Sequence, residues 1–247
     1  MKKTTLFCAA ILVCLTVASM GPLAADSIGL AEGNDGAPLA AGDIVTFGRY
    51  QQTESVTDRT PIEWLVLERD DEKVLLVSRY LLEDLQFNQE RTGAAWDDST
   101  LRIWLNVVFL NMAFTEDERA AILLTDLDNS WKEGHGRDCV DGGADTQDMV
   151  FLLSYKQAMR YFRGKKDRVC AHTDYLVAKF TEKYGVKRQE INENGYWWLR
   201  SPGQAVNCVI FIQDDGSIAY GYVTNEDICV RPALWVDLAS IASHDAE

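Results

Sequence analysis

The chain has 247 residues, of which 25% are charged and 47% are hydrophobic, with 17 glycines and 5 prolines. This composition excludes collagen-like, low-complexity and largely disordered chains. The formal net charge is −14, from 24 basic and 38 acidic residues. Binding to nucleic acid or to an anionic membrane surface is therefore disfavoured, because both need clustered lysine and arginine.

Residues 1–25 have the features of a secretory signal peptide. Lys2 and Lys3 precede an apolar run over residues 4–18, and Leu23-Ala24-Ala25 offers small residues for cleavage before Asp26. The run is short for a membrane span of about 20 residues, so an uncleaved anchor or a lipidated cysteine is the less favoured alternative. We expect an exported protein, secreted or in the cell envelope or periplasm, with no membrane insertion after signal cleavage.

Residues 26–42 are rich in Gly, Ala, Asp and Asn and lack apolar periodicity, which predicts a disordered linker. One ordered domain is predicted over residues 43–238, followed by a tail over residues 239–247. The domain begins with three predicted strands, at residues 44–50, 61–67 and 73–78. The second and third flank a charged turn at residues 68–72, a pattern typical of a β-hairpin.

The middle of the domain has helical patterns. An apolar stripe with spacings of three and four predicts a helix that begins at Ser99 or Thr100 and buries Leu101, Trp104, Leu105, Val108 and Met112. Two capping boxes predict further helix starts, at Thr115 with Glu118 and at Ser154 with Gln157. A fourth helix is predicted over residues 174–184.

The segment from Asp126 to Asp148 is a long stretch rich in Gly and Asp, which predicts a surface loop. Its aspartates do not have the spacing of an EF-hand. No cofactor is expected, and calcium bound by this loop is the one alternative.

The chain ends in strands, predicted at residues 197–199, 206–212, 217–223 and 228–236. Asp214-Asp215-Gly216 is the clearest hairpin turn, and Pro232 implies a sheet edge or a strand end because proline has no N–H to donate. Strands at both ends of the domain with helices grouped between them predict an α+β fold.

Four cysteines follow the predicted signal, namely Cys139, Cys170, Cys208 and Cys229. An even number in an exported chain predicts disulfides, and the three pairings stay open. We prefer Cys208 with Cys229, because both fall in apolar strands close in sequence; a third strand between them would rule this pairing out. No close Cys-x-x-Cys pair indicates zinc or thioredoxin-type chemistry.

The strand at residues 217–223 alternates large and small side chains. Tyr220 and Tyr222 share one face, while Ala219, Gly221 and Val223 share the other. If the small face packs inward, the tyrosines form a recognition surface; if the tyrosine face packs inward, they are core. The predicted ligand-binding set comprises Tyr196, Trp198, Arg200, Asn207, Tyr220, Tyr222 and Asn225.

Arg200 has two interpretations, as a two-pronged partner of a ligand carboxylate or phosphate and as a structural donor to backbone carbonyls. The second is favoured. Structural roles are also assigned to Trp64, Trp104, Trp197, Arg231 and Trp235.

Catalytic patterns are missing from the sequence. It contains no Gly-x-Ser-x-Gly elbow, no phosphate-binding Gly-x-x-x-x-Gly-Lys and no His-Glu-x-x-His. The three histidines are His135 in the long loop, His172 before a predicted helix and His244 in the tail. We therefore predict no catalytic residues and no metal site.

Five sequence blocks occur in one order along the chain: PIEWLVL…KVLLVS, the stretch from Trp96 to Phe114, FLLS at residues 151–154, WWLRSPG at residues 197–203, and VRPALWV at residues 230–236. Together they resemble the DUF6273 domain, a bacterial family of unknown function often found on exported proteins. The resemblance covers roughly residues 43–236.

That family is more distantly similar to the formylglycine-generating-enzyme branch of the C-type lectin fold, which includes the variable proteins of diversity-generating retroelements. The resemblance implies a small, twisted, mostly antiparallel sheet that joins the N- and C-terminal strands. The copper-binding cysteine pair of the sulfatase-activating members is not matched, because Cys208 and Cys229 lie far apart in sequence. The histidine cluster of the iron-dependent relatives and the calcium motifs of sugar-binding lectins are also missing.

The sequence and the resemblance together lead to one functional expectation. It is an exported, non-catalytic binding module whose extracellular ligand is a glycan, a peptide or a protein. The alternatives are a metal-dependent enzyme of the formylglycine-generating-enzyme class and a purely structural envelope protein.

Overall fold

The computed structural model describes residues 39–242 except 92, 94 and 137, and gives no side-chain exposure for 241 and 242. The predicted signal peptide and His244 lie outside the described residues. Leu39, which belongs to the predicted linker, is 4% exposed and packs in the core. The N–H of Gly42 also donates to the carbonyl of Val66 (2.9 Å).

The first sheet joins the two ends of the domain. It contains β1 (Ile44–Tyr50), β2 (Thr60–Arg69), β3 (Lys73–Ser78) and β11 (Ala233–Asp237) in the order β1-β2-β3-β11. All its pairs are antiparallel, so the predicted β2–β3 hairpin is confirmed. The register of β1 shifts at Gly48, which has a φ of +67°. A Cβ there would lie 2.5 Å from the Phe114 ring, so only glycine fits.

The second sheet has the strand order β4-β10-β7-β8-β9. Its members are β4 (Glu83–Asp84), β7 (Tyr196–Pro202), β8 (Cys208–Ile212), β9 (Ile218–Tyr222) and β10 (Ile228–Val230). Only the β10–β7 pair is parallel. The hairpin predicted at residues 214–216 is confirmed as the β8–β9 connection.

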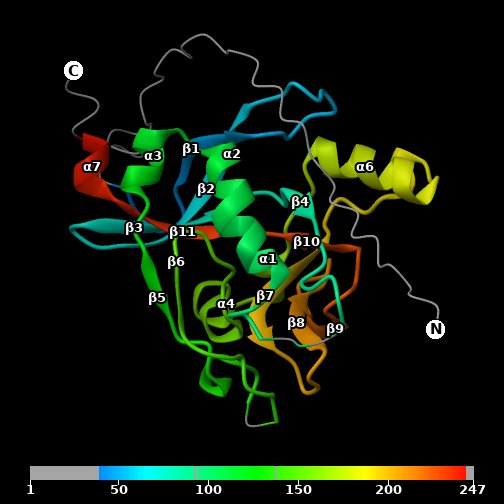
Figure 1. The fold of residues 1–247 in the computed structure, drawn as a ribbon. Helices are drawn as coiled ribbons and strands as arrows, with labels where there is room; N and C mark the ends of the chain where they lie inside the picture. The colour runs from blue at the N-terminus through cyan, green and yellow to red at the C-terminus, as the bar shows by residue number, and fades with distance from the viewer. Residues whose placement is uncertain (1–38, 92, 94, 137, 243–247) are drawn as a thin grey trace, which may run out of the picture.

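The chain changes sheets at Arg231 and Pro232, between β10 and β11. The prediction of a single strand over residues 228–236 is therefore wrong, because these residues form two strands that belong to different sheets. Pro232 lies between the end of β10 and the start of β11, where its missing N–H interrupts neither strand. The α+β class is confirmed, with two curled and mostly antiparallel sheets flanked by helices (Figure 1).

One long helix contains a π-helical segment. It consists of α1 (Thr100–Ile103), η1 (Trp104–Phe109) and α2 (Leu110–Ala113), and the Ser99 side chain caps its start. Leu101 and Leu105 are buried as predicted, but Val108 and Met112 are 40% and 52% exposed. A π turn holds more residues per turn than an α turn. The residues after Leu105 are therefore rotated, and Phe109 and Ala113 are buried instead.

Two further helices, α3 (Glu116–Ala121) and α4 (Tyr155–Tyr161), begin at their predicted caps, and α6 (Asp174–Tyr184) has its predicted bounds. The sequence did not predict the short α5 (Lys165–Arg168), α7 (Leu238–Ala242), η2 (Trp131–Glu133) and η3 (Arg188–Glu190). The long loop is closed by a two-stranded ladder of β5 (Thr125–Leu127) and β6 (Thr146–Asp148). Within the described part of the chain, no helix is long and apolar enough to cross a membrane.

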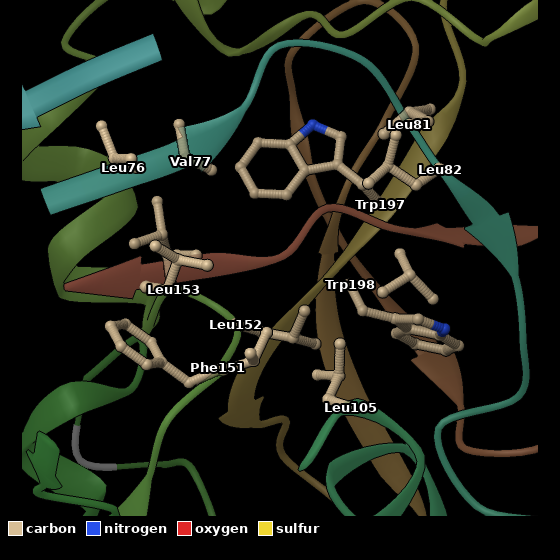
Figure 2. Packing of buried hydrophobic residues seen from close by; sticks show 14 of the residues in the cluster. Leu76, Val77, Leu81, Leu82, Leu105, Phe151, Leu152, Leu153, Trp197 and Trp198 are labelled. Carbon is tan, nitrogen blue, oxygen red and sulfur yellow. The ribbon is translucent and has the colours of Figure 1, made fainter. Parts of the chain in front are cut away.

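The core continues across both faces of β7. Trp197 and Trp198 are fully buried and point to opposite sides of the strand, because neighbouring strand residues alternate. Figure 2 shows Trp197 beside Leu81 and Val77, and Trp198 on the other side with Leu105. Burial of such large apolar side chains stabilises the fold by about 2–3 kcal/mol each.

Asp58 organises the loop between β1 and β2. Its carboxylate accepts hydrogen bonds from the backbone of Gln52 (2.7 Å) and Thr53 (2.8 Å), and from the N–H (3.1 Å) and hydroxyl (2.5 Å) of Thr60. Partial burial alone would raise the pKa of Asp58, but these donors outweigh it and lower the pKa to about 2.

We expect Asp58→Ala to lower the free energy of unfolding by about 1 kcal/mol at neutral pH, because the loop loses its acceptor. A depressed carboxyl pKa contributes stability above the unfolded value of 3.8, and this contribution is lost as the pH falls toward about 2. Urea unfolding of both proteins at pH 7 and at decreasing acidic pH measures the difference. A difference that does not shrink on acidification would contradict this role of the carboxylate.

Candidate binding surface

The small face of β9 packs inward. Gly221 is buried, and a Cβ at this position would lie 3.0 Å from Ile228 Cδ1 and 3.2 Å from the Phe211 ring. Tyr220 and Tyr222 on the opposite face are 38% and 47% exposed. Of the two packing alternatives, the one with exposed tyrosines is therefore observed.

Tyr220 is held by a side chain from the long loop. Its hydroxyl lies 2.7 Å from Nδ1 of His135. The His135 ring in turn packs on the ring of Tyr155 at the start of α4, with centroids 4.6 Å apart. Burial raises the pKa of Tyr220, so its phenol stays neutral near pH 7 and keeps a proton that it can donate.

Tyr222 is covered on one side by Arg91. The guanidinium carbon lies 4.4 Å from the ring centroid, within the range of a cation–π contact. Together, Tyr220, Tyr222, His135, Tyr155 and Arg91 form what we call the tyrosine surface. β9 is the last strand in its sheet, so the surface lies at a sheet edge.

The other predicted ligand-binding residues differ in their distance from β9 and in their burial. Asn207 and Asn225 lie next to β9: the carbonyl of Asn207 accepts from Val223 N (3.0 Å), and Asn225 N donates to Tyr222 O (2.9 Å). Tyr196 is half-buried, with its ring 5.7 Å from that of Phe211. Trp198 is fully buried, and its Nε1 donates to the carbonyl of Leu85 (2.9 Å).

Arg200 is also buried, at 3% exposure. Its guanidinium donates to the carbonyls of Leu152 (3.0 Å) and Asp128 (3.3 Å), to Gln157 Oε1 (2.6 Å) and to Asn129 Oδ1 (3.3 Å). Burial lowers its pKa to about 10, and nearby carboxylates oppose this effect. Arg200 therefore remains charged near pH 7 and joins the long loop to α4 and β7.

The residues predicted to be structural have three kinds of environment. Trp64 and Trp197 are fully buried, and their indole nitrogens donate to the carbonyls of Phe47 (2.7 Å) and Arg168 (3.0 Å). Arg231 is buried between aromatic rings, with its guanidinium 4.9 Å from the Trp197 ring, and its Nε donates to a backbone carbonyl (3.0 Å). Trp104 and Trp235 are half-buried.

None of the four cysteines in the described residues forms a disulfide. The preferred pair of Cys208 and Cys229 is not formed because β7 lies between β8 and β10. Burial raises the pKa of Cys139, Cys170 and Cys229, which keeps these three thiols protonated near neutral pH.

No group of three or more His, Cys, Asp or Glu side chains among the described residues could hold a metal ion. In the long loop, the carboxylate of Asp148 is occupied by Arg102 Nε (2.6 Å) and Trp96 Nε1 (2.8 Å). Asp145 accepts from the backbone of Asn129 (3.0 Å). These two carboxylates therefore serve as internal acceptors.

The sequence did not indicate the partners of the two tyrosines. Arg91, His135 and Tyr155 come from three segments far apart in the chain, and no local pattern connects them with β9. The sequence places His135 only in a loop, and the length of that loop is the one signal that singles out this segment.

Comparison with known proteins identifies the family to which the chain belongs. A profile described as "Domain of unknown function (DUF6273)" matches residues 71–238, more than half of the chain. No curated protein and no solved structure matches. The matched region runs from the turn before β3 through β11 and includes β9, the long loop and α4, so the chain belongs to the DUF6273 family.

Proposed function

We propose that the protein is an exported, non-catalytic binding module that engages an extracellular glycan, peptide or protein through the tyrosine surface. The observation that carries the proposal is the orientation of β9. Its small face packs against Phe211 and Ile228, and its two tyrosine rings face outward.

The chemistry of the tyrosine surface suits recognition. Tyrosine rings offer large, rigid contact areas with a polar tip, so little conformational entropy is lost when a ligand orders them. Contacts from His135 and Arg91 hold both rings in place before a ligand arrives. A preorganised surface of this kind binds more tightly than one that must first be ordered.

Two expectations from the sequence support the same proposal. The N-terminal 25 residues would direct the chain out of the cytoplasm, where an extracellular ligand is accessible. In the C-type lectin-like relatives that the family resembles, ligand contacts come from the C-terminal region, which here contains β8 and β9. Function does not follow from a fold resemblance, so the tyrosine surface carries the argument.

The test is a glycan and peptide array probed with the mature protein and with the double variant Tyr220→Ala/Tyr222→Ala. The double variant is expected to lose about tenfold or more in affinity, because exposed aromatic anchors dominate binding energy. Leu124→Ala is the control, since Leu124 is 61% exposed outside the tyrosine surface. An unchanged affinity of a correctly folded double variant for the array ligand would contradict the proposal.

A further inference from the structure

A groove with a volume of about 520 Å³ lies between the helix containing η1 and helix α6, and neither Tyr220 nor Tyr222 lines it. Asp84 of β4 is part of its lining, and Figure 1 shows β4 between α1 and α6. Trp104 lines the groove from the first position of the π-helical segment. π-helical segments are often found at functional sites.

The two lysines of the groove are already paired with carboxylates. Lys179 Nζ lies 2.5 Å from Glu83 Oε1 and also contacts Asp84. Lys183 Nζ lies 3.1 Å from Asp84 Oδ2 and donates to the carbonyl of Glu226 (2.7 Å). Burial alone would lower the pKa of each lysine, but these acidic partners outweigh it and raise both. Both side chains therefore stay ammonium ions and cannot serve as nucleophiles near neutral pH.

Three other lining groups remain available to a ligand. Within the described residues, the indole N–H of Trp104, the amide of Gln89 and the carboxylate of Glu182 make no hydrogen bond or ion pair. Trp104 is half-buried, and Gln89 and Glu182 are exposed. The groove thus offers two donors, a set of acceptor oxygens and an aromatic ring.

The charges of the groove select against anionic ligands. An anion would meet the carboxylates of Glu182 and Glu226 and would find both ammonium groups already paired. A cation would be attracted by these carboxylates, but its own donors would leave the indole N–H of Trp104 and the amide N–H of Gln89 without an acceptor. A neutral molecule with many hydroxyls uses both kinds of group: its hydroxyls can donate to the carboxylates and accept from the indole and amide N–H groups.

We propose that this groove binds a neutral oligosaccharide, with one sugar ring packed against Trp104 and its hydroxyls bonded to Gln89 and Glu182. The volume is within the range of small-molecule sites, which combine an apolar wall with a few placed polar groups. The inference goes beyond the tyrosine surface, because it assigns a second site with its own residues. Either site can fail its test without affecting the other.

Calorimetric titration of the mature protein with four probes tests the inference: N-acetylglucosamine tetramer, cellotetraose, spermidine and inorganic phosphate. At least one of the two neutral oligosaccharides is expected to bind. Trp104→Ala should weaken this binding about tenfold or more, and Gln89→Ala and Glu182→Gln about threefold to tenfold each. Glu193→Gln is the matched control for Glu182→Gln, because Glu193 is exposed but does not line the groove.

Trp104 also packs against Phe109, with ring centroids 5.6 Å apart, so Trp104→Ala is checked by circular dichroism. Gln89 and Glu182 are exposed, and their variants test the groove even if Trp104→Ala unfolds. Oligosaccharide binding that is weakened by the groove variants but not by Tyr220→Ala/Tyr222→Ala supports the inference. Binding of spermidine or phosphate alone, binding of none of the probes, or oligosaccharide binding that the groove variants leave unchanged would overturn it.

Discussion

Arg200→Met is expected to lower the free energy of unfolding by about 3–5 kcal/mol. Methionine fills most of the space but donates no hydrogen bond. The carbonyls of Leu152 and Asp128 and the side-chain oxygens of Gln157 and Asn129 would each lose a donor. Buried acceptors without partners cost about 1–3 kcal/mol each, and partial relaxation reduces the sum.

Urea unfolding monitored by circular dichroism measures this loss. Arg160→Met is the control, because its side chain is 65% exposed and pairs with Glu68 at the surface, where an ion pair contributes about 0–1 kcal/mol. The structural role of Arg200 would be contradicted by a variant that keeps its stability but loses ligand binding. That result would favour the other interpretation of Arg200, in which its guanidinium binds the ligand.

Lys179→Met is the second variant with a large expected effect, a loss of about 3 kcal/mol in the free energy of unfolding. Lys179 pairs with Glu83, whose side chain is only 10% exposed, and shares Asp84, which is 2% exposed, with Lys183. Removal of one partner of a buried ion pair leaves charge without compensation and costs about 3–5 kcal/mol. The lower end applies because the lysine side chain itself is 34% exposed.

The pH dependence of this loss follows from the raised pKa of Lys179. A raised basic pKa contributes its full stability below the unfolded value of 10.5, and the contribution disappears only as the pH rises through the folded value. The difference between wild type and variant should therefore be constant from pH 6 to 9. Lys166→Met on α5, where the lysine is exposed, should leave stability nearly unchanged. A loss below 1 kcal/mol for Lys179→Met would contradict the proposed role of the ion cluster.

The sequence predicted those parts of the fold that local hydrogen bonds determine. Ser99, Thr115 and Ser154 cap helices in the structure because a side-chain oxygen reaches a backbone N–H three residues later. The β2–β3 and β8–β9 hairpins were also predictable, since their turns lie between adjacent strands. Each of these elements is specified within a short segment.

Two features of the fold could not be predicted in this way. The division of residues 228–236 depends on β10 lying beside β7 while β11 lies beside β3, and these partners are distant in sequence. The π-helical segment rotates the apolar stripe, so Val108 and Met112 are exposed where a regular period would bury them. A prediction that assumes one fixed helical period cannot anticipate a π-helical segment.

The candidate surface could be predicted only in part, because it too depends on contacts between segments that are distant in sequence. Alternation along β9 placed Tyr220 and Tyr222 on one face, but the direction of that face depends on the contacts of Gly221 with Ile228 and Phe211. Trp198 follows Trp197 in a strand buried on both faces, so the sequence could not reveal that it lacks an exposed face.

Hydroxyl-radical footprinting with the tightest array ligand tests the central claim most directly. Tyr220 and Tyr222 should be oxidised in the free protein and protected in the complex, because the ligand covers both rings. Tyr184, 48% exposed on α6, is the internal reference and should be oxidised equally in both states. Unchanged oxidation of both β9 tyrosines in a saturated complex would contradict the assignment of the binding surface.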